Sequence, residues 1–272
     1  MESLSRFLTE RCRKGILPWS VEDAAAGRFG ISPREIEEKA LSLDLLPERY
    51  RRNMGTLSIR EQLILLQSVA AIVGCGGLGG YVIEELARLG VGILKAIDPD
   101  VFEEHNLNRQ ILCTRATIGR PKVEAARERV ALINPAATVI SLQETFGMAN
   151  GARLLENAGV AVDGLDTIRA RIELSMVCET ASIPLVHGTI GGWYGQVAAQ
   201  MPGETTVRKI YRNSETERGI EEVLGTPAFS PAVIASLQVA EVCKILLHRR
   251  TLLSGRLVFL NLLDIEMEKV DI

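Results

Sequence analysis

Val73-Gly-Cys-Gly-Gly-Leu-Gly-Gly80 is the most informative stretch of this 272-residue chain. It follows an apolar run of buried-strand length, Val69–Val73, and it precedes a helical pattern of apolar residues. Glycines at the spacing Gly74-x-Gly76-x-x-Gly79 allow a tight turn and let the backbone approach a phosphate, which then faces the positive end of a helix. The stretch therefore predicts a nucleotide-binding turn between a strand and a helix.

An acidic residue after the next predicted strand agrees with this interpretation. Asp98 lies 22 residues beyond Gly76, where a carboxylate accepts hydrogen bonds from a ribose. The glycines and the acid alone are also typical of NAD binding, and a tight turn without any ligand is a third possibility. The choice among these depends on the charged residues that follow.

Those residues favour a triphosphate. Asn106, Arg109 and Lys122 come within 25 residues of Asp98 and bring donors and positive charge to the carboxyl edge of the predicted sheet. Asp166 follows a later strand and is placed to hold Mg²⁺, which prefers oxygen ligands. Hydride transfer needs little positive charge there. Cleavage of a triphosphate, in contrast, requires Arg, Lys and a metal ion to neutralise the negative charge of the phosphates. The set predicts ATP rather than NAD.

Strands and helices alternate from residue 68 onward, which predicts a mostly parallel sheet because helical crossovers connect parallel strands. Residues 193–201, 256–261 and 266–270 are predicted as further strands, around a long helix from 230 to about 247. The predicted fold class is α/β, a Rossmann-like sheet extended by antiparallel C-terminal strands. The polar segment 203–226 is predicted to be a mobile crossover segment or lid.

The first 47 residues are predicted to form a helical N-terminal extension, and residues 48–272 the nucleotide-binding domain. Two helices separated by a turn at Gly30 resemble a helix-turn-helix. The second of them is net acidic, with three glutamates, Glu35, Glu37 and Glu38, against two basic residues. A DNA-recognition helix approaches phosphates and should not be acidic. We therefore expect a helical appendage packed on the main domain.

Composition excludes several partners. The formal charge is −3 and the pI is about 5.8, so no nucleic-acid partner is expected. No apolar run reaches the ~18–20 residues of a membrane span, and the N-terminal residues lack the apolar segment of a secretory signal. We expect a soluble, cytoplasmic protein without a membrane partner. Five cysteines lie far apart with no C-x-x-C pair, which does not fit a disulfide framework or a four-thiolate zinc site.

Several motifs, taken in order, resemble the ThiF/MoeB/HesA family, the bacterial relatives of ubiquitin-activating enzymes. The resemblance covers about residues 48–265 and its set of motifs is highly specific. Besides the glycine stretch it rests on Arg49-Tyr-Arg-Arg-Asn53, Asp98-Pro-Asp100, Asn106-Leu-Asn-Arg-Gln110, Gly119-Arg-Pro-Lys-Val123, Asn134-Pro135, Asp163-Gly-Leu-Asp166 and Ser236-Leu-Gln-x-x-Glu241.

The resemblance implies ATP- and Mg²⁺-dependent adenylation of the C-terminal glycine of a small ubiquitin-fold sulfur carrier ending in Gly-Gly, of the ThiS or MoaD kind. It places the chain in molybdopterin, tungstopterin or thiamine biosynthesis, acting as a homodimer, and makes residues 48–272 the adenylation domain. The family's arginine that reaches the triphosphate across the dimer interface matches Arg52. The other implied roles are phosphate cradling by Gly77 and its neighbours (Gly74, Gly76 and Gly79), ribose binding by Asp98, phosphate binding by Asn106, Arg109 and Lys122, and metal coordination by Asp166.

The chain departs from the family at three places. The two C-x-x-C pairs that usually hold a structural zinc are missing, so no zinc is expected. Glu221 stands where many members have a cysteine that accepts the carrier or its sulfur, so a thioester or persulfide on that segment is not expected. Thr167 replaces the usual asparagine after the metal-binding aspartate.

Two other functions stay open at this stage. The first is an NAD-dependent oxidoreductase, and the second is a catalytically silent, dimeric carrier-binding module. His187 is predicted to be a core histidine whose hydrogen bonds are satisfied, and Cys113 and Cys178 to be packing residues.

Overall fold

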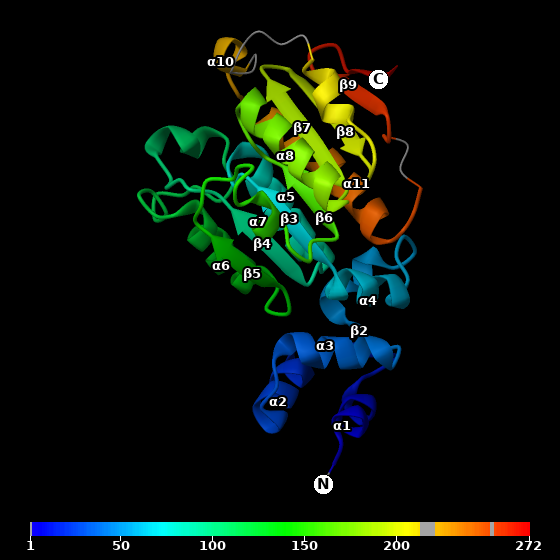
Figure 1. Ribbon diagram of the computed structural model, residues 1–272. Helices are drawn as coiled ribbons and strands as arrows, with labels where there is room; N and C mark the ends of the chain where they lie inside the picture. Colours follow the sequence, from blue (N-terminus) through cyan, green and yellow to red (C-terminus); the bar gives the residue numbers. More distant parts are fainter. Residues whose placement is uncertain (1, 213–220, 251–252) are drawn as a thin grey trace.

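The computed structural model describes residues 2–212, 221–250 and 253–272. Its centre is an eight-stranded sheet in the order β10-β9-β8-β7-β6-β3-β4-β5 (Figure 1). The neighbours β5, β4, β3, β6 and β7 pair in parallel. From β7 through β8 and β9 to β10 the pairing is antiparallel. The bounds are β3 Val69–Val73, β4 Ile93–Ile97, β5 Thr138–Leu142, β6 Val160–Asp163, β7 Leu185–Gly191, β8 Tyr194–Gln200, β9 Arg256–Asn261 and β10 Glu266–Asp271.

The predicted fold class is confirmed, with one correction in length. The apolar run over residues 184–186 predicts only a short strand, whereas β7 continues to Gly191. The extension pairs with β8 along its whole length, from Leu185 opposite Gln200 to Gly191 opposite Tyr194. A glycine-rich segment is a weak strand former by itself, so this antiparallel partner decides the length of the strand.

Helices cover both faces of the sheet. One face carries α5 (Gly77–Leu89), α6 (Lys122–Ile133) and α11 (Phe229–Leu246), and the other carries α7 (Gly151–Leu154), α8 (Ile168–Ala181) and α9 (Thr206–Ile210). Successive residues of β3 belong to different cores, because side chains alternate across a strand. Ala70 and Ile72 pack under α5 and α11, whereas Ala71 and Val73 pack on the opposite face with residues of α8. Burial on both faces explains why the strand is apolar throughout.

Helix α11 is a core helix. Its length and composition, with a mean hydropathy of 1.4, would allow it to cross a membrane. However, it packs on α5 and on strands β6 to β8, and Ile234, Ala235 and Val242 are fully buried inside the protein.

The N-terminal residues form α1 (Leu4–Arg11), α2 (Trp19–Phe29) and α3 (Pro33–Ser42), together with two short parallel strands, β1 (Ile16–Leu17) and β2 (Leu46–Pro47). The turn at Gly30 is left-handed, and Ser32 begins α3 with a capping box. α3 packs against α4 (Ile59–Gln67), and Figure 1 shows these helices below the amino ends of the strands. Arg34 donates to the carbonyl of Gly92, just before β4, at 3.1 Å.

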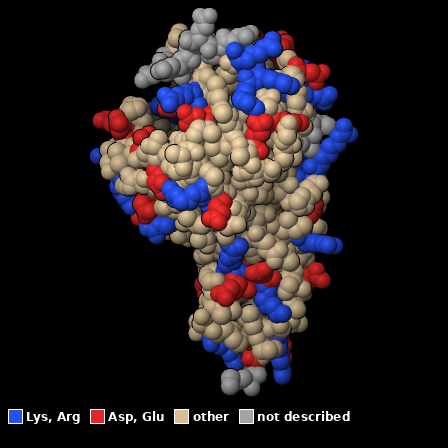
Figure 2. All heavy atoms as spheres, viewed as in Figure 1, with Lys and Arg blue, Asp and Glu red and all other residues tan. Residues whose placement is uncertain are grey.

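A largely buried charge cluster joins this extension to the rest of the chain, at the level where the molecule becomes narrower in Figure 2. Arg49 lies at the start of the 3₁₀ helix η1 (Glu48–Asn53) and pairs with both Glu22 and Glu37. The Glu37 carboxylate is fully buried and also accepts the Tyr50 hydroxyl at 3.2 Å. Thus Glu37, one of the three glutamates that argued against DNA recognition, faces inward and pairs with Arg49.

We expect Glu37→Gln to lower the free energy of unfolding by about 2–3 kcal/mol. Removing one member of a buried ion pair leaves the other charge uncompensated, and Glu22 limits the loss because it still faces Arg49. Chemical denaturation measures the change. The matched control is Glu48→Gln, whose ion pair with Arg51 is exposed and should cost less than about 0.5 kcal/mol. Equal effects of the two substitutions would contradict the prediction.

Candidate active site

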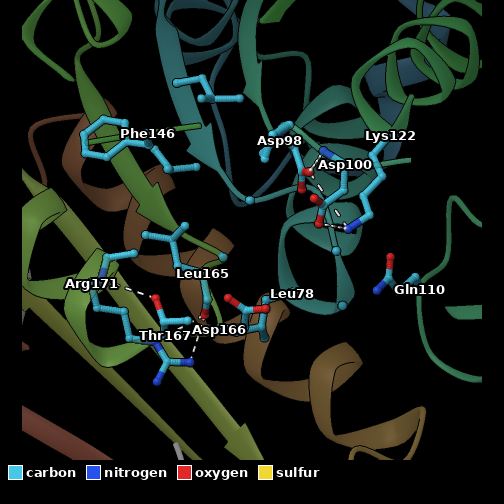
Figure 3. Close-up of a pocket in the computed structure, with 18 of the residues that line it drawn as sticks. Leu78, Asp98, Asp100, Gln110, Lys122, Phe146, Leu165, Asp166, Thr167 and Arg171 are labelled. Carbon is cyan, nitrogen blue, oxygen red and sulfur yellow. Dashed lines mark hydrogen bonds and ion pairs between the residues drawn. The ribbon is translucent and has the colours of Figure 1, made fainter. Parts of the chain in front are cut away.

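A cavity of about 630 Å³ opens at the carboxyl ends of β3, β4 and β6. The chain runs from β3 outward through β4 to β5, and then returns to place β6 on the other side of β3. This reversal is the topological switch point at which α/β sheets bind ligands. Figure 3 shows Asp98, Asp100 and Lys122 on one side of the pocket and Asp166, Leu165 and Arg171 on the other.

The glycines of the turn between β3 and α5 have two different structural roles. A Cβ on Gly79 would lie 1.7 Å from the carbonyl oxygen of Gly74, and one on Gly74 would lie 2.4 Å from that of Gly164. These two glycines therefore allow the turn after β3 to lie in close contact with α5 and with the loop after β6. Gly76 and Gly77 line the pocket, and the nearest atoms to an added Cβ there are 3.5 Å and 3.6 Å away. Since α5 begins at Gly77, its first-turn amides are placed to receive phosphate.

Gly79 differs from the predicted role in one respect. It does not belong to the residues that line the pocket, because its missing side chain is needed for contact between α5 and the turn that follows β3. Gly79 therefore shapes the turn, and its part in nucleotide binding stays a prediction.

Asp98 and Lys122 meet at one wall of the pocket, as predicted. The Asp98 carboxylate accepts the amides of Cys75 at 2.7 Å and Asp100 at 2.8 Å. Lys122 Nζ lies 2.9 Å from Asp100 and 3.9 Å from Asp98. Burial raises the pKa of Asp98, and the Lys122 ammonium opposes that rise. A cation is thus held beside the expected ribose position at the end of β4.

Arg109 also lines the pocket, and burial lowers the pKa of its guanidinium. Its Nη1 donates to Asn108 Oδ1 at 2.8 Å and to the His105 carbonyl at 3.1 Å. Asn106 is buried beside it but outside the pocket lining, where its side chain accepts the Glu103 amide at 3.0 Å. Asn106 therefore shapes the turn η2 (Glu104–Asn108) that presents Arg109, and its contact with phosphate stays a prediction.

Asp166 lies in the loop after β6 and lines the pocket. Its side chain is exposed, and within the described ranges its carboxylate has no hydrogen-bond or ion-pair partner. The described residues contain no cluster of three His, Cys, Asp or Glu, as a protein-only metal cage would need. Mg²⁺ instead uses one or two carboxylates together with substrate phosphates. A single free carboxylate opposite a phosphate cradle fits that ion.

The pocket lining also includes Arg171, Phe146 and Gln110, for which the sequence predicted no role in the site. Arg171 of α8 is buried and donates to the Leu165 carbonyl at 2.8 Å. Phe146, after β5, and Gln110, after η2, also line the pocket. An aromatic ring and an amide give a nucleotide base an apolar wall and a polar edge, which is the usual composition of a small-molecule pocket.

Arg52 is not brought to this pocket. It is exposed on η1, and the neighbouring Tyr50 packs at Gly90, beyond the last residue of α5. A 13-residue helix separates that point from the glycine turn, which is about 20 Å at 1.5 Å per residue. Within one chain, Arg52 therefore lies at the wrong end of α5 for its own pocket.

The predicted crossover segment contains α9 and the short helix α10 (Glu221–Leu224), while residues 213–220 lie outside the described residues. At its start, Glu204 accepts the Met201 amide at 2.9 Å and the Thr206 hydroxyl at 3.4 Å. It also accepts the Ser254 hydroxyl. One carboxylate thus connects the end of β8, the start of α9 and the approach to β9.

Cys113, Cys178 and His187 lie in the core, as predicted. Cys113 and Cys178 are buried, and burial raises the pKa of Cys178 to about 12. His187 is fully buried, with Asp163 and Tyr211 as hydrogen-bond partners.

The doubly wound sheet, the glycine cradle and the converging charges at the switch point define a Rossmann-like nucleotide-binding protein. The chain belongs to the ThiF family, whose profile matches residues 50–272. It is 33% identical over 235 residues to the "SAMP-activating enzyme E1" of Haloferax volcanii, covering 85% of this chain and 87% of that protein. It is 31% identical to the "Molybdopterin-synthase adenylyltransferase" of Salmonella typhimurium, covering 82% and 91%.

Solved structures agree on the fold. E. coli MccB has a TM-score of 0.70 at 22% identity, covering 82% of this chain and 69% of that one. E. coli TcdA, a tRNA N6-threonylcarbamoyladenosine dehydratase, has a TM-score of 0.63 at 23% identity, covering 74% and 95%. The curated relatives are named as adenylyltransferases and activating enzymes, and they give no support to hydride transfer. Membership of the family implies the use of ATP.

We expect Lys122→Gln to raise the ATP concentration needed for half-maximal activity at least tenfold. The substitution removes the cation nearest to Asp98 and leaves that buried carboxylate without its positive neighbour, which raises the Asp98 pKa further. Nucleotide-dependent thermal shift measures binding directly. Lys244→Gln is the control, because Lys244 pairs with Glu241 on α11. An unchanged ATP-dependent shift in Lys122→Gln would contradict a phosphate-binding role.

Proposed function

We propose that this protein is an ATP- and Mg²⁺-dependent adenylyltransferase that activates the C-terminal glycine carboxylate of a small ubiquitin-fold sulfur carrier. The observation that carries the proposal is the convergence of Lys122, Arg109 and a free Asp166 carboxylate on one glycine-rich cradle. Such a charge set suits a nucleotide that is cleaved at its phosphates. Relatives named SAMP-activating enzyme and molybdopterin-synthase adenylyltransferase support the same reaction class.

In this reaction a carboxylate oxygen of the carrier forms a bond to the α-phosphorus of ATP, and pyrophosphate leaves. The chain needs no general base, because the attacking carboxylate is ionised at neutral pH. Asp98 orients the ribose, and the amides at the start of α5 with Lys122 and Arg109 stabilise the phosphate charge. Asp166 would hold Mg²⁺, which supplies charge neutralisation at the departing pyrophosphate. Catalysis therefore comes from positioning and electrostatics.

The proposal includes a homodimer located in the cytoplasm. Arg52 lies about one helix length from its own pocket, so a phosphate-binding role requires a second copy of the chain. In that dimer, η1 of one protomer would bring Arg52 to the triphosphate of its partner. The pathway supplied with the activated carrier is molybdopterin, tungstopterin or thiamine synthesis.

The test is isotope exchange between pyrophosphate and ATP in the presence of a ThiS- or MoaD-like carrier from the same genome. We expect exchange with a carrier ending in Gly-Gly and none with the same carrier lacking its last glycine, with the acyl-adenylate detected by mass. Exchange that does not depend on the carrier would contradict the substrate. A complete lack of exchange with every such carrier would favour a catalytically silent binding module.

A further inference from the structure

A buried polar pair lies directly beneath the Asp166 loop. Asp163 is the last residue of β6 and His187 belongs to the neighbouring parallel strand β7. Both side chains are fully buried, and His187 Nδ1 lies 2.6 Å from Asp163 Oδ2. Apolar residues of similar volume commonly give equal or greater stability than a buried pair of ionisable groups. The pair is therefore better explained by what it holds in place than by stability.

The pair continues into a chain of hydrogen bonds. His187 Nε2 lies 3.2 Å from the Tyr211 hydroxyl, with the two rings edge to face at 87°. The same hydroxyl accepts a hydrogen bond from Arg171 Nη1 at 3.4 Å. Because Arg171 can only donate, the Tyr211 oxygen is the acceptor of that contact. The Asp163 carboxylate is the acceptor of its contact with His187, so Nδ1 donates to it.

Both ends of this chain of hydrogen bonds reach Leu165, which lies in the loop after β6. Asp163 Oδ1 accepts the Leu165 amide at 2.9 Å. At the other end, Arg171 donates to the Leu165 carbonyl through Nη2 at 2.8 Å and Nε at 3.2 Å. Both backbone polar groups of Leu165 are therefore fixed, and Figure 3 shows Leu165 and Arg171 beside Asp166. The residue that is fixed immediately precedes the free carboxylate.

The same loop also supports the phosphate cradle. A Cβ on Gly164 would lie 2.6 Å from the carbonyl oxygen of Gly74 and 3.2 Å from the amide of Gly79. From the other side, Gln238 of α11 donates to the Asp163 carbonyl at 2.9 Å. A displacement of residues 163–166 would therefore disturb the metal-binding carboxylate and the glycine turn together.

We propose that His187 and Tyr211 are positioning residues that direct Asp166 at the metal ion of the nucleotide complex. They act through Asp163 and Arg171, which hold Leu165 in one orientation. The inference rests on the proposed function, since it concerns the metal site of that reaction. Neither residue touches the pocket itself, and their effect on the metal ion passes through the loop.

The experiment compares three variants with the wild-type enzyme. His187→Leu removes both hydrogen bonds, Tyr211→Phe removes the bond to Nε2, and His187→Asn keeps an N–H that can donate to Asp163. Two readouts are used: the Mg²⁺ concentration for half-maximal pyrophosphate exchange, and the affinity for Mn²⁺ of the complex with α,β-methylene ATP, measured by the electron paramagnetic resonance of free Mn²⁺. The second readout involves no turnover.

We expect His187→Leu to weaken both metal readouts about 10-fold or more, because loss of groups that orient a metal ligand typically costs 10–100-fold in affinity. His187→Asn should recover most of the loss, and Tyr211→Phe should show a shift of about threefold. The control His248→Asn, at an exposed residue with a positive φ that asparagine tolerates, should change neither readout.

The inference is overturned if His187→Leu folds and binds Mn²⁺ as the wild type does, or if the wild-type nucleotide complex binds no Mn²⁺. If His187→Leu does not fold, an unchanged Mn²⁺ affinity in Tyr211→Phe overturns it. Absence of pyrophosphate exchange in the wild type, with Mn²⁺ affinities in the predicted order, would count against the proposed function alone.

Discussion

Asp166→Asn is expected to reduce carrier-dependent pyrophosphate exchange by about 10²–10³-fold while leaving the fold intact. The carboxylate is exposed in the pocket, so its substitution should change the free energy of unfolding by no more than about 0.5 kcal/mol. The loss arises because an amide oxygen is a much weaker ligand for Mg²⁺ than a carboxylate, and the charge at the departing pyrophosphate is then poorly stabilised.

Two comparisons make this result specific. Asp23→Asn, an exposed carboxylate on α2, should leave exchange unchanged. Raising the Mg²⁺ concentration should recover part of the activity of Asp166→Asn, because the defect lies in metal affinity. Wild-type exchange rates in Asp166→Asn would remove the metal role of this residue and with it the main argument for phosphate cleavage.

The main features of the site could be predicted because they follow from strand ends. The glycine turn after β3, Asp98 after β4 and Asp166 after β6 all occur where a buried parallel strand stops. The carboxyl ends of such strands meet at one edge of a sheet, so their chain order alone brings these residues to a common pocket. Lys122 could be predicted for the same reason, since it begins α6, the α-helix between β4 and β5.

Arg171 shows where this logic fails. Arg169 and Arg171 both lie in the first turn of α8 and look equivalent in the sequence. Two positions along a helix differ by about 200° in direction, so they face opposite ways. Arg169 pairs with Glu173 on the surface, while Arg171 is buried at the pocket wall. Only the position of α8 on the sheet decides which arginine reaches the loop.

Polar contacts between different elements could not be predicted from the sequence for a similar reason. Glu37 was recognised as acidic, but its partner Arg49 comes from another element. For Glu37 the residue type was informative, but the partner depended on packing between elements that no local pattern specifies. Asn106 is a local case: its side chain accepts the amide of Glu103, three residues earlier, and closes the turn that holds Arg109, while its contact with phosphate stays a prediction.

The second large effect is expected from Gly79→Ala, which should lower the free energy of unfolding by about 3–5 kcal/mol and abolish nucleotide binding. The added methyl group would lie 1.7 Å from the Gly74 carbonyl oxygen, a backbone atom that cannot turn away as a side chain would. Relief requires α5 to move off β3, which opens the buried contacts beneath it and displaces the amides that face the pocket.

The neighbouring glycine provides a matched control for this prediction. In Gly80→Ala the new methyl group would meet only the side chains of Ile111 and Leu112, at 3.5 Å, which is ordinary van der Waals contact. Alanine is favoured over glycine inside a helix by about 1 kcal/mol, so Gly80→Ala should be neutral or stabilising. Urea denaturation and nucleotide-dependent thermal shift measure both variants. Similar stabilities for Gly79→Ala and Gly80→Ala would show that α5 does not need close backbone contact at the turn, and the glycine spacing would then have to be explained by the ligand alone.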